Sequence, residues 1–204
     1  MDVDSTLIQD EVIELLADEA GVRAEVAEIT DRAMRGEIDF EQSLRERVSM
    51  LKGLPESVFE RVQERIRLSD GARTLISAVH ASGGRVGAVS GGFNQILTPL
   101  ASKLNLDYYA ANELEVVNGL LTGQLLGEVI DRAAKAAKLE LWAKDFGISV
   151  ELVAAIGDGA NDLDMFESAG LSFAYNAKPA VRERADVIID APDLSLVIPH
   201  LGLK

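Results

Sequence analysis

Residues 152–162 read Leu-Val-Ala-Ala-Ile-Gly-Asp-Gly-Ala-Asn-Asp, and this stretch carries the clearest signal of the fold class. Its first part, Leu152–Ile156, is a short apolar run typical of a strand that is buried on both faces of a parallel sheet. Gly157 and Gly159 then allow a tight turn into a helix, which we expect to end near Ala169. A buried strand, a sharp turn and a helix in succession predict an α/β fold.

The same alternation of strands and helices extends over the chain from about residue 70 onward. In open parallel sheets, ligands bind beyond the carboxyl ends of the strands, so the residues that follow each strand are the candidates for chemistry. A hairpin turn is indicated by Asn118-Gly119 within Leu114–Leu126. The other elements predicted in this part are strands at Val86–Val89, Leu171–Tyr175 and Val187–Ile189 and a helix at Gln95–Leu104.

Residues 7–69 have a helical sequence pattern instead, because apolar side chains recur there at helical spacing, as in Val58–Ile66. No strand signal interrupts this helical stretch. We therefore predict two domains: a core formed by residues 1–10 and 70–204, and a small helical domain of residues 11–69 inserted into it.

Composition narrows the function classes. The chain carries 34 acidic and 20 basic residues, and this net charge of −14 argues against a general nucleic-acid binder. It has no cysteine, which excludes thiolate chemistry and makes a reducing cytoplasm the expected location. No apolar run approaches the roughly 18 residues of a membrane span. We expect a small-molecule substrate and no nucleic-acid or membrane partner, and leave a homodimer open.

Two acidic segments are candidates for chemistry. The first is Asp2-Val3-Asp4-Ser5-Thr6, and the second, with Asp158 and Asp162, follows the predicted strand Leu152–Ile156. Paired carboxylates suit a hard cation such as Mg²⁺, and one carboxylate can act as a nucleophile while another transfers protons. The alternatives are an acidic loop whose hydroxyl residues cap the next helix, and an Asx-type turn. Neither segment has the spacing of a calcium loop or of a dinucleotide fingerprint.

Val89-Ser90-Gly91-Gly92 also lies between a predicted strand and a helix. A hydroxyl and free backbone N–H groups at this position would bind a phosphate oxygen, and the alternative is a simple turn. Only two histidines exist, His80 and His200, so a Ser-His triad is poorly supported. Three lysines share one predicted helix, and spacing alone does not choose which would neutralise a phosphate: Lys135, Lys138 and Lys144.

The chain has an acid pair first, followed by a hydroxyl residue, a lysine and a second acid pair. This order resembles that of the haloacid dehalogenase superfamily. The Asp-x-Asp-x-Thr form of residues 2–6 is similar to that of its phosphatases. Three further segments resemble the phosphoserine phosphatase family within it, namely Gly157–Asp162, Ser90-Gly91-Gly92-Phe93 and Ala177-Lys178-Pro179. The resemblance covers nearly the whole chain. It implies a Rossmann-like parallel-sheet core with a small helical cap inserted after the first motif.

The resemblance also implies roles for individual residues. Asp2 would be the nucleophile, and Asp4 would be the general acid and base. Mg²⁺ would be held by Asp2, the backbone carbonyl of Asp4 and Asp158, with Asp162 in support. The residues that would bind the phosphate group are Ser90, Gly91, Lys135 and Asn161.

By the same resemblance, four residues of the helical cap would choose the substrate. Glu11 would pair with the amino group of phosphoserine and Arg47 with its carboxylate, while Met34 and Phe40 would cover the pocket. The implied reaction is the Mg²⁺-dependent hydrolysis of O-phospho-L-serine through an aspartyl-phosphate, the last step of serine biosynthesis. The alternatives are a phosphatase or phosphotransferase for another small phosphomonoester, and an inactive binding protein with the same fold.

One departure from the family pattern concerns the start of the sequence. Members of the family have an apolar strand before the first acid pair, whereas only Met1 precedes Asp2 here. Without that strand, we expect its neighbours in the sheet to lose a ladder of hydrogen bonds, each unpaired buried group costing roughly 1–3 kcal/mol. We therefore expect a true start further upstream or a truncated chain.

Overall fold

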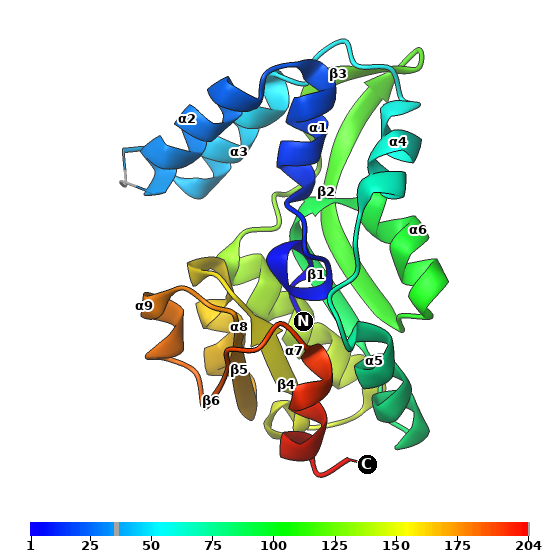
Figure 1. Cartoon of the computed structure of the whole chain (residues 1–204), viewed down its shortest axis with the longest axis vertical. Coiled ribbons are helices and arrows are strands. Elements are labelled where there is room, and N and C mark those ends of the chain that lie inside the picture. Colours follow the sequence, from blue (N-terminus) through cyan, green and yellow to red (C-terminus); the bar gives the residue numbers. More distant parts are fainter. Residues whose placement is uncertain (35–36, 204) are drawn as a thin grey trace.

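The computed structural model describes residues 1–34 and 37–203 as an α/β fold with a helical part above the sheets (Figure 1). No helix in these residues combines the length and the apolar character that a membrane crossing requires. The strands are β1 (Gly87–Phe93), β2 (Tyr108–Val117), β3 (Leu120–Leu126), β4 (Ala154–Gly157), β5 (Leu171–Tyr175) and β6 (Val187–Ile189). The helices are α1 (Val12–Ala20), α2 (Arg23–Met34), α3 (Phe40–Ser49), α4 (Val58–Arg65), α5 (Ala72–Ala81), α6 (Asn94–Leu104), α7 (Arg132–Phe146), α8 (Leu163–Ser168) and α9 (Pro179–Arg182).

The strands form two three-stranded groups in the orders β1-β2-β3 and β4-β5-β6, and every pair is parallel except β2 with β3. The N-terminal residues lie between the two groups. The Met1 ammonium donates to the Gly87 carbonyl at 2.8 Å, and Val89 N–H donates to the Met1 carbonyl at 3.0 Å. On the other side, Asp2 N–H donates to the Ile156 carbonyl at 2.9 Å. Met1 and Asp2 thus supply hydrogen bonds that we expected β1 and β4 to lack.

Both faces of the parallel sheet are buried, as the unbroken apolar runs predict. Successive side chains of a strand point to opposite faces. Ile156 and Phe173 accordingly pack in one hydrophobic cluster, together with Leu75 of α5. Their neighbours Ala155 and Ala174 pack in a second cluster, which also contains Leu139 of α7 and Phe166 of α8. The sheet is therefore held between two layers of helices, and the carboxyl ends of its strands remain free to form a site.

The hairpin β2–β3 joins the sheet to the helical part of the chain (Figure 1). Its turn is Asn118-Gly119, as predicted, and both residues have the positive φ of a type I′ turn, 52° and 76°. Beside this turn, Leu121 N–H donates to the Leu54 carbonyl and Gly53 N–H donates to the Leu121 carbonyl, each at 2.8 Å. The hairpin therefore fixes the loop that follows α3, and with it the position of α3 above the sheet.

Candidate active site

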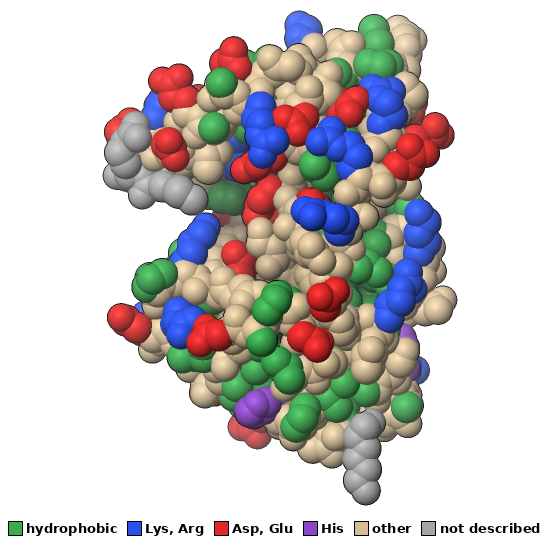
Figure 2. Space-filling model, viewed as in Figure 1, with side chains coloured by type: hydrophobic (Ala, Val, Ile, Leu, Met, Phe, Trp, Pro, Cys, Tyr) green, Lys and Arg blue, Asp and Glu red, His purple; other side chains and the backbone are tan. Residues whose placement is uncertain are grey.

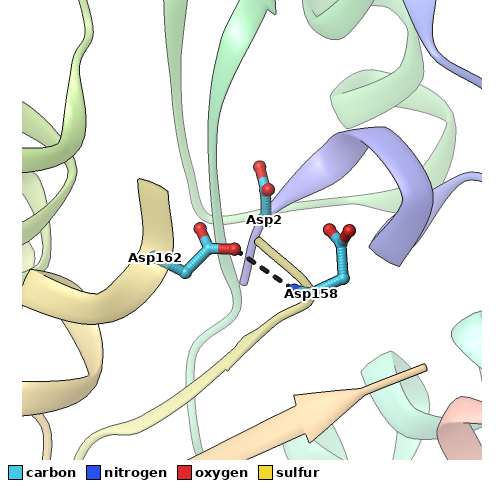
Figure 3. A group of neighbouring side chains, drawn as sticks. All are labelled: Asp2, Asp158 and Asp162. Atoms are coloured by element: carbon cyan, nitrogen blue, oxygen red, sulfur yellow. Dashed lines mark hydrogen bonds between the residues drawn. The ribbon is translucent and has the colours of Figure 1, made fainter. Parts of the chain in front are cut away.

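Three carboxylates converge beyond the end of β4 (Figure 3). Asp2 comes from the N-terminal segment, Asp158 directly follows β4, and Asp162 ends the turn that leads into α8. One carboxylate oxygen of each residue lies within 4.8 Å of the others. Asp2 and Asp162 are buried, whereas Asp158 is partly exposed. Clustered carboxylate oxygens are the ligands that hard divalent cations prefer, so the cluster fits a metal such as Mg²⁺.

Asp162 also shapes the loop that carries Asp158. Its Oδ2 accepts a hydrogen bond from the backbone N–H of Asp158 at 3.2 Å (Figure 3) and another from that of Gly159 at 3.1 Å. A Cβ at position 157 would come within 2.3 Å of the same oxygen, so only glycine fits there. Thr6 Oγ1 donates to Asp158 Oδ1 at 3.3 Å from the other side. Asp158 is therefore held by Asp162, on the same loop, and by Thr6 of the N-terminal segment.

Lys135, in the first turns of α7, lies inside the cluster. Its Nζ is 2.7 Å from Asp2 Oδ1 and 2.8 Å from Asp162 Oδ1, and its side chain is only 1% exposed. Lys138 is partly exposed on the same helix and Lys144 is exposed. Of the three lysines between which spacing did not choose, Lys135 is thus the one that the structure brings to the carboxylates.

Negative charge is in excess at this cluster. Burial and the charge of Asp162 raise the pKa of Asp2 well above its usual range, although Lys135 opposes the shift. Burial and Asp162 also raise the pKa of Asp158, to about 6. Burial alone would lower the pKa of Lys135, but the two carboxylates that contact it raise the value above normal. A site with one buried cation and several carboxylates is suited to a further positive ion.

Asp4 approaches the cluster through a tight turn at Val3–Leu7, in which Ser5 adopts a left-handed φ of 55°. Its Oδ1 accepts a hydrogen bond from Val12 N–H at 2.8 Å, and its Oδ2 accepts one from Ser90 Oγ at 2.7 Å. The carboxylate of Asp4, rather than the hydroxyl of Ser5 or Thr6, therefore satisfies the first N–H of α1. Burial raises the pKa of Asp4, while the hydrogen bonds from Val12 and Ser90 oppose this.

The segment Ser90–Gly92 is a bulge at the end of β1. Val89 pairs with Ala110 and Phe93 with Asn112, so three residues of β1 face a single residue of β2. Gly92 N–H donates to Ser90 Oγ at 2.7 Å, and a Cβ at Gly92 would come within 2.9 Å of both Ser90 Oγ and Asp4 Oδ2. The bulge therefore brings backbone and hydroxyl groups into direct contact with the second carboxylate of the first motif.

Glu11 lies at the start of α1, close to the same turn. Ser5 Oγ donates to its Oε1 at 2.6 Å. Although the side chain is exposed, partial desolvation and the charge of Asp4 raise the pKa of Glu11 to about 7. Glu11 is therefore a carboxylate that becomes fully charged only above neutral pH.

Arg47 and Phe40 approach the site from α3. Burial lowers the pKa of Arg47, while the charges of Glu11 and Asp4 oppose the shift, so the guanidinium faces these acids. Within residues 1–34 and 37–203 it has no ion-pair partner within 4.0 Å, and its Nε donates only to the Ser43 carbonyl. The ring of Phe40 lies 3.1 Å from where a Cβ on Gly91 would stand. Of Met34, only the backbone at the end of α2 belongs to the described residues.

A hollow separates the helical part from the core on this side of the molecule. It lies between the region of α2 and α3 and the region of α8 and α9, with acidic side chains inside it (Figure 2). The half-exposed Asn161 stands in the turn before α8. Helix α3, which carries Phe40 and Arg47, and helix α8, which follows Asn161, thus lie on opposite sides of the hollow (Figure 1).

Two contacts at the site were not predicted from the sequence. These are the hydrogen bond from Thr6 to Asp158 and the one from Ser5 to Glu11. The hydroxyls of residues 5 and 6 were considered only as helix caps. Their positions directly after Asp4 are the one signal that could have indicated them, because a tight turn after a strand end brings successive side chains to the same site.

Comparison with known proteins agrees with this geometry. A model of the haloacid dehalogenase-like hydrolase family matches residues 1–167. A phosphoserine phosphatase from Streptococcus thermophilus is 53% identical over 98% of this chain and 94% of its own length. A Streptomyces coelicolor phosphoserine phosphatase is 54% identical over the whole chain, but the chain spans only 50% of that protein.

Solved structures give the same result. The phospho-aspartyl intermediate analogue of a phosphoserine phosphatase has a TM-score of 0.92 and 46% identity, covering 98% of this chain and 96% of that one. A substrate-bound phosphoserine phosphatase complex matches with the same TM-score and identity. These likenesses confirm the fold and the resemblance predicted from the motifs. The chain belongs to the haloacid dehalogenase-like hydrolase family, within its phosphoserine phosphatase branch.

Proposed function

We propose that this chain is a phosphatase that hydrolyses O-phospho-L-serine to L-serine and phosphate, the last step of serine biosynthesis. The observation that carries the proposal is the buried Lys135 in contact with Asp2 and Asp162, beside a serine hydroxyl that contacts Asp4. A lysine and a hydroxyl suit a phosphate dianion, and two adjacent carboxylates suit nucleophilic attack and proton transfer. The similarity to the Streptococcus thermophilus phosphoserine phosphatase supports the choice of substrate.

The cluster of carboxylates is proposed to hold Mg²⁺. Its ligands would be Asp2, the backbone carbonyl of Asp4 and Asp158, with Asp162 in support. When bound, the ion would offset the negative charge that keeps a carboxylate away from a phosphate dianion. Removal of divalent cations with EDTA is expected to stop phosphate release, and added Mg²⁺ to restore it. Phosphate release that continues unchanged in EDTA would contradict this assignment.

The first half of the reaction uses both acids of the first motif. An oxygen of Asp2 forms a bond to phosphorus as the bond between phosphorus and the seryl oxygen breaks. Asp4 gives its proton to that oxygen, and the burial that raises the pKa of Asp4 favours the protonated form that this step requires. Ser90, Lys135, Asn161 and the N–H of Gly91 hold the phosphoryl oxygens.

The second half returns the enzyme to its starting state. A water molecule attacks phosphorus, its proton passes to Asp4, and the carboxylate of Asp2 is released. Asp4 can receive this proton because it is ionised after the first step. In the free enzyme its carboxylate accepts from Val12 N–H and Ser90 Oγ, and the bond from Val12 N–H holds the carboxylate in place when Ser90 donates its one proton to the phosphate.

Residues 11–69 are proposed to form a cap domain that selects the amino-acid part of the substrate, with residues 1–10 and 70–204 as the catalytic core. Glu11 would bind the ammonium group, and Arg47, which lacks an ion-pair partner among the described residues, would bind the carboxylate. Phe40 contacts Gly91 and would close the pocket above the phosphate, together with Met34.

A panel of three substrates tests this proposal. O-phosphoethanolamine lacks the carboxylate of phosphoserine, and 3-phosphoglycerate has a hydroxyl in place of its amino group. We expect kcat/KM for O-phospho-L-serine to exceed both by about 100-fold or more, because a site built for a charged group is left with unpaired charge when that group is missing. Similar kcat/KM values for the three compounds would contradict the proposed substrate.

Variants assign the preference to individual residues. Arg47→Ala is expected to narrow the gap between phosphoserine and phosphoethanolamine, and Glu11→Gln the gap between phosphoserine and phosphoglycerate. Arg45→Ala is the matched control, because Arg45 lies on the same helix but pairs with Glu41 at 2.7 Å. It should leave all three rates unchanged.

A further inference from the structure

We propose that Asn112 is a positioning residue for phosphoryl transfer, which fixes the orientation of Ser90 and ties it to the helix that carries Lys135. The inference rests on the proposed function, in which both of these residues hold the phosphate. Asn112 lies on β2 and is only 2% exposed, so it does not contact substrate from solvent. It would act through the backbone of the two segments that it joins.

Both ends of the Asn112 amide are occupied. Its Nδ2 donates to the Gly91 carbonyl at 2.8 Å, and its Oδ1 accepts from Ile130 N–H at 2.8 Å. With the amide turned around, Nδ2 would face a donor and Oδ1 an acceptor, so both hydrogen bonds would be lost. The two partners therefore determine the orientation of the amide.

The first of these bonds is linked to Asp4 through a single peptide plane. In a trans peptide, the carbonyl of Gly91 and the N–H of Gly92 point in opposite directions. Because Asn112 holds that carbonyl, the N–H of Gly92 is directed at Ser90 Oγ, 2.7 Å away. With this lone pair of Ser90 occupied, its hydroxyl proton points to Asp4 Oδ2, also at 2.7 Å. Asn112 thereby fixes the position of Ser90 Oγ, whose one proton points to Asp4 in the free enzyme and would turn to a phosphoryl oxygen when the phosphate binds.

The second bond reaches the start of α7. Ile130 directly precedes Asp131, which accepts from Ala134 N–H through its side chain at 2.8 Å and so begins the helix. The carbonyl of Asp131 accepts from Lys135 N–H at 3.0 Å. Holding Ile130 therefore fixes the turn that carries Lys135. One buried amide thus joins the hydroxyl and the lysine that are proposed to contact the phosphate.

The bulge in β1 explains why a side chain is needed at this place. Between the pairs Val89–Ala110 and Phe93–Asn112, Ser90–Gly92 leaves the regular ladder of the sheet. Buried backbone groups require a partner, and a carbonyl that departs from a ladder must find it elsewhere. Asparagine offers a donor and an acceptor together, which neither aspartate nor leucine does. The residue type is therefore matched to the two groups that it binds.

Asn112→Asp tests the inference, because it keeps the shape and the bond to Ile130 but places an oxygen against the Gly91 carbonyl. The control is Asn94→Asp. Asn94 holds the same strand through bonds of 2.9 and 3.0 Å to the carbonyl and N–H of Ala111, and its Nδ2 also donates to Glu113 Oε2 at 3.1 Å; none of these partners is a proposed site residue. Two quantities are measured with Mg²⁺ present: the steady-state constants for O-phospho-L-serine, and the dissociation constant of inorganic phosphate by calorimetry.

We expect Asn112→Asp to lower kcat/KM by about tenfold to 100-fold and to weaken phosphate binding by about tenfold. Asn94→Asp should leave kcat and phosphate affinity within about twofold of the wild type, whatever it does to Tm. If Asn112 only stabilised the fold, some Asn112→Asp molecules would be unfolded. Calorimetry would then find fewer phosphate sites per molecule, and the affinity of the remaining sites would be unchanged. Wild-type phosphate affinity in Asn112→Asp would overturn the inference, and so would an equal loss of affinity in Asn94→Asp.

If Asn112→Asp does not fold, the neutral Asn112→Ala is measured in its place, with the same expected loss of phosphate affinity and the same control. If the wild-type chain binds phosphate but does not hydrolyse phosphoserine, the proposed substrate is wrong, and the phosphate titration alone still decides the role of Asn112.

Discussion

Replacement of Lys135 by methionine should reveal how much the buried charge cluster depends on its one cation. The side chains of Lys135, Asp2 and Asp162 are 1%, 5% and 0% exposed, with contacts of 2.7 and 2.8 Å. Methionine keeps most of the volume but removes the cation that contacts both buried carboxylates. Breaking a buried ion pair in this way costs about 3–5 kcal/mol. That is a large share of the roughly 5–15 kcal/mol by which a domain of this kind is stable.

The assay is urea unfolding at neutral pH in EDTA, with Lys138→Met as the control. Lys138 is partly exposed on the same helix, so its replacement should change the free energy of unfolding by about 0.5 kcal/mol or less. The deficit of Lys135→Met should shrink as the pH falls, because Asp2 already has a raised pKa and takes up a proton in the folded state. Equal stability of the two variants at neutral pH would refute the reasoning.

Three other predictions concern single residues. Asp158→Asn should abolish turnover but raise the free energy of unfolding in EDTA at neutral pH by about 1–2 kcal/mol. The pKa of Asp158 is raised to about 6, so its charge destabilises the fold once the pH exceeds that value. A lower Tm than the wild type in EDTA would contradict this. The kcat/KM for phosphoserine should rise with pH through about 7, where Glu11 ionises. Glu11→Gln should remove this rise from the pH profile. An unchanged profile in the variant would assign the rise to another group. Gly92→Ala should lower kcat by about tenfold or more, since its Cβ would lie within 2.9 Å of Asp4 Oδ2 and Ser90 Oγ. The measured kcat is compared with the fraction of folded protein, which circular dichroism gives.

The strands and turns of the core could be predicted from the sequence because their signals are local. Leu171–Tyr175 and Val187–Ile189 have the predicted bounds, and the hairpin turns at Asn118-Gly119. The first half of β2, Tyr108–Asn112, was missed. It contains polar and aromatic residues, and it forms a strand because it pairs with β1, a partner outside any local window.

The expected loss of pairing around the first acid pair illustrates a second limit. Sequence reasoning treated a strand as present or absent, whereas Met1 and Asp2 alone supply hydrogen bonds to both β1 and β4. At the site, the position of Asp158 followed from the end of a predicted strand, and its approach to Asp2 and Asp162 followed from the family resemblance. The contacts of Ser5, Thr6 and Asn112 could not be predicted in this way, because they depend on the geometry of a turn and of a bulge.

Asp2 should carry a phosphoryl group during turnover, and rapid acid quenching followed by mass spectrometry of the N-terminal peptide would detect it. During turnover of O-phospho-L-serine with Mg²⁺, the account predicts the mass of one phosphoryl group on Asp2, which hydroxylamine removes and which is absent from Asp2→Asn. A phosphoryl group on Asp158 or on Ser90, or wild-type turnover by Asp2→Asn, would contradict the account.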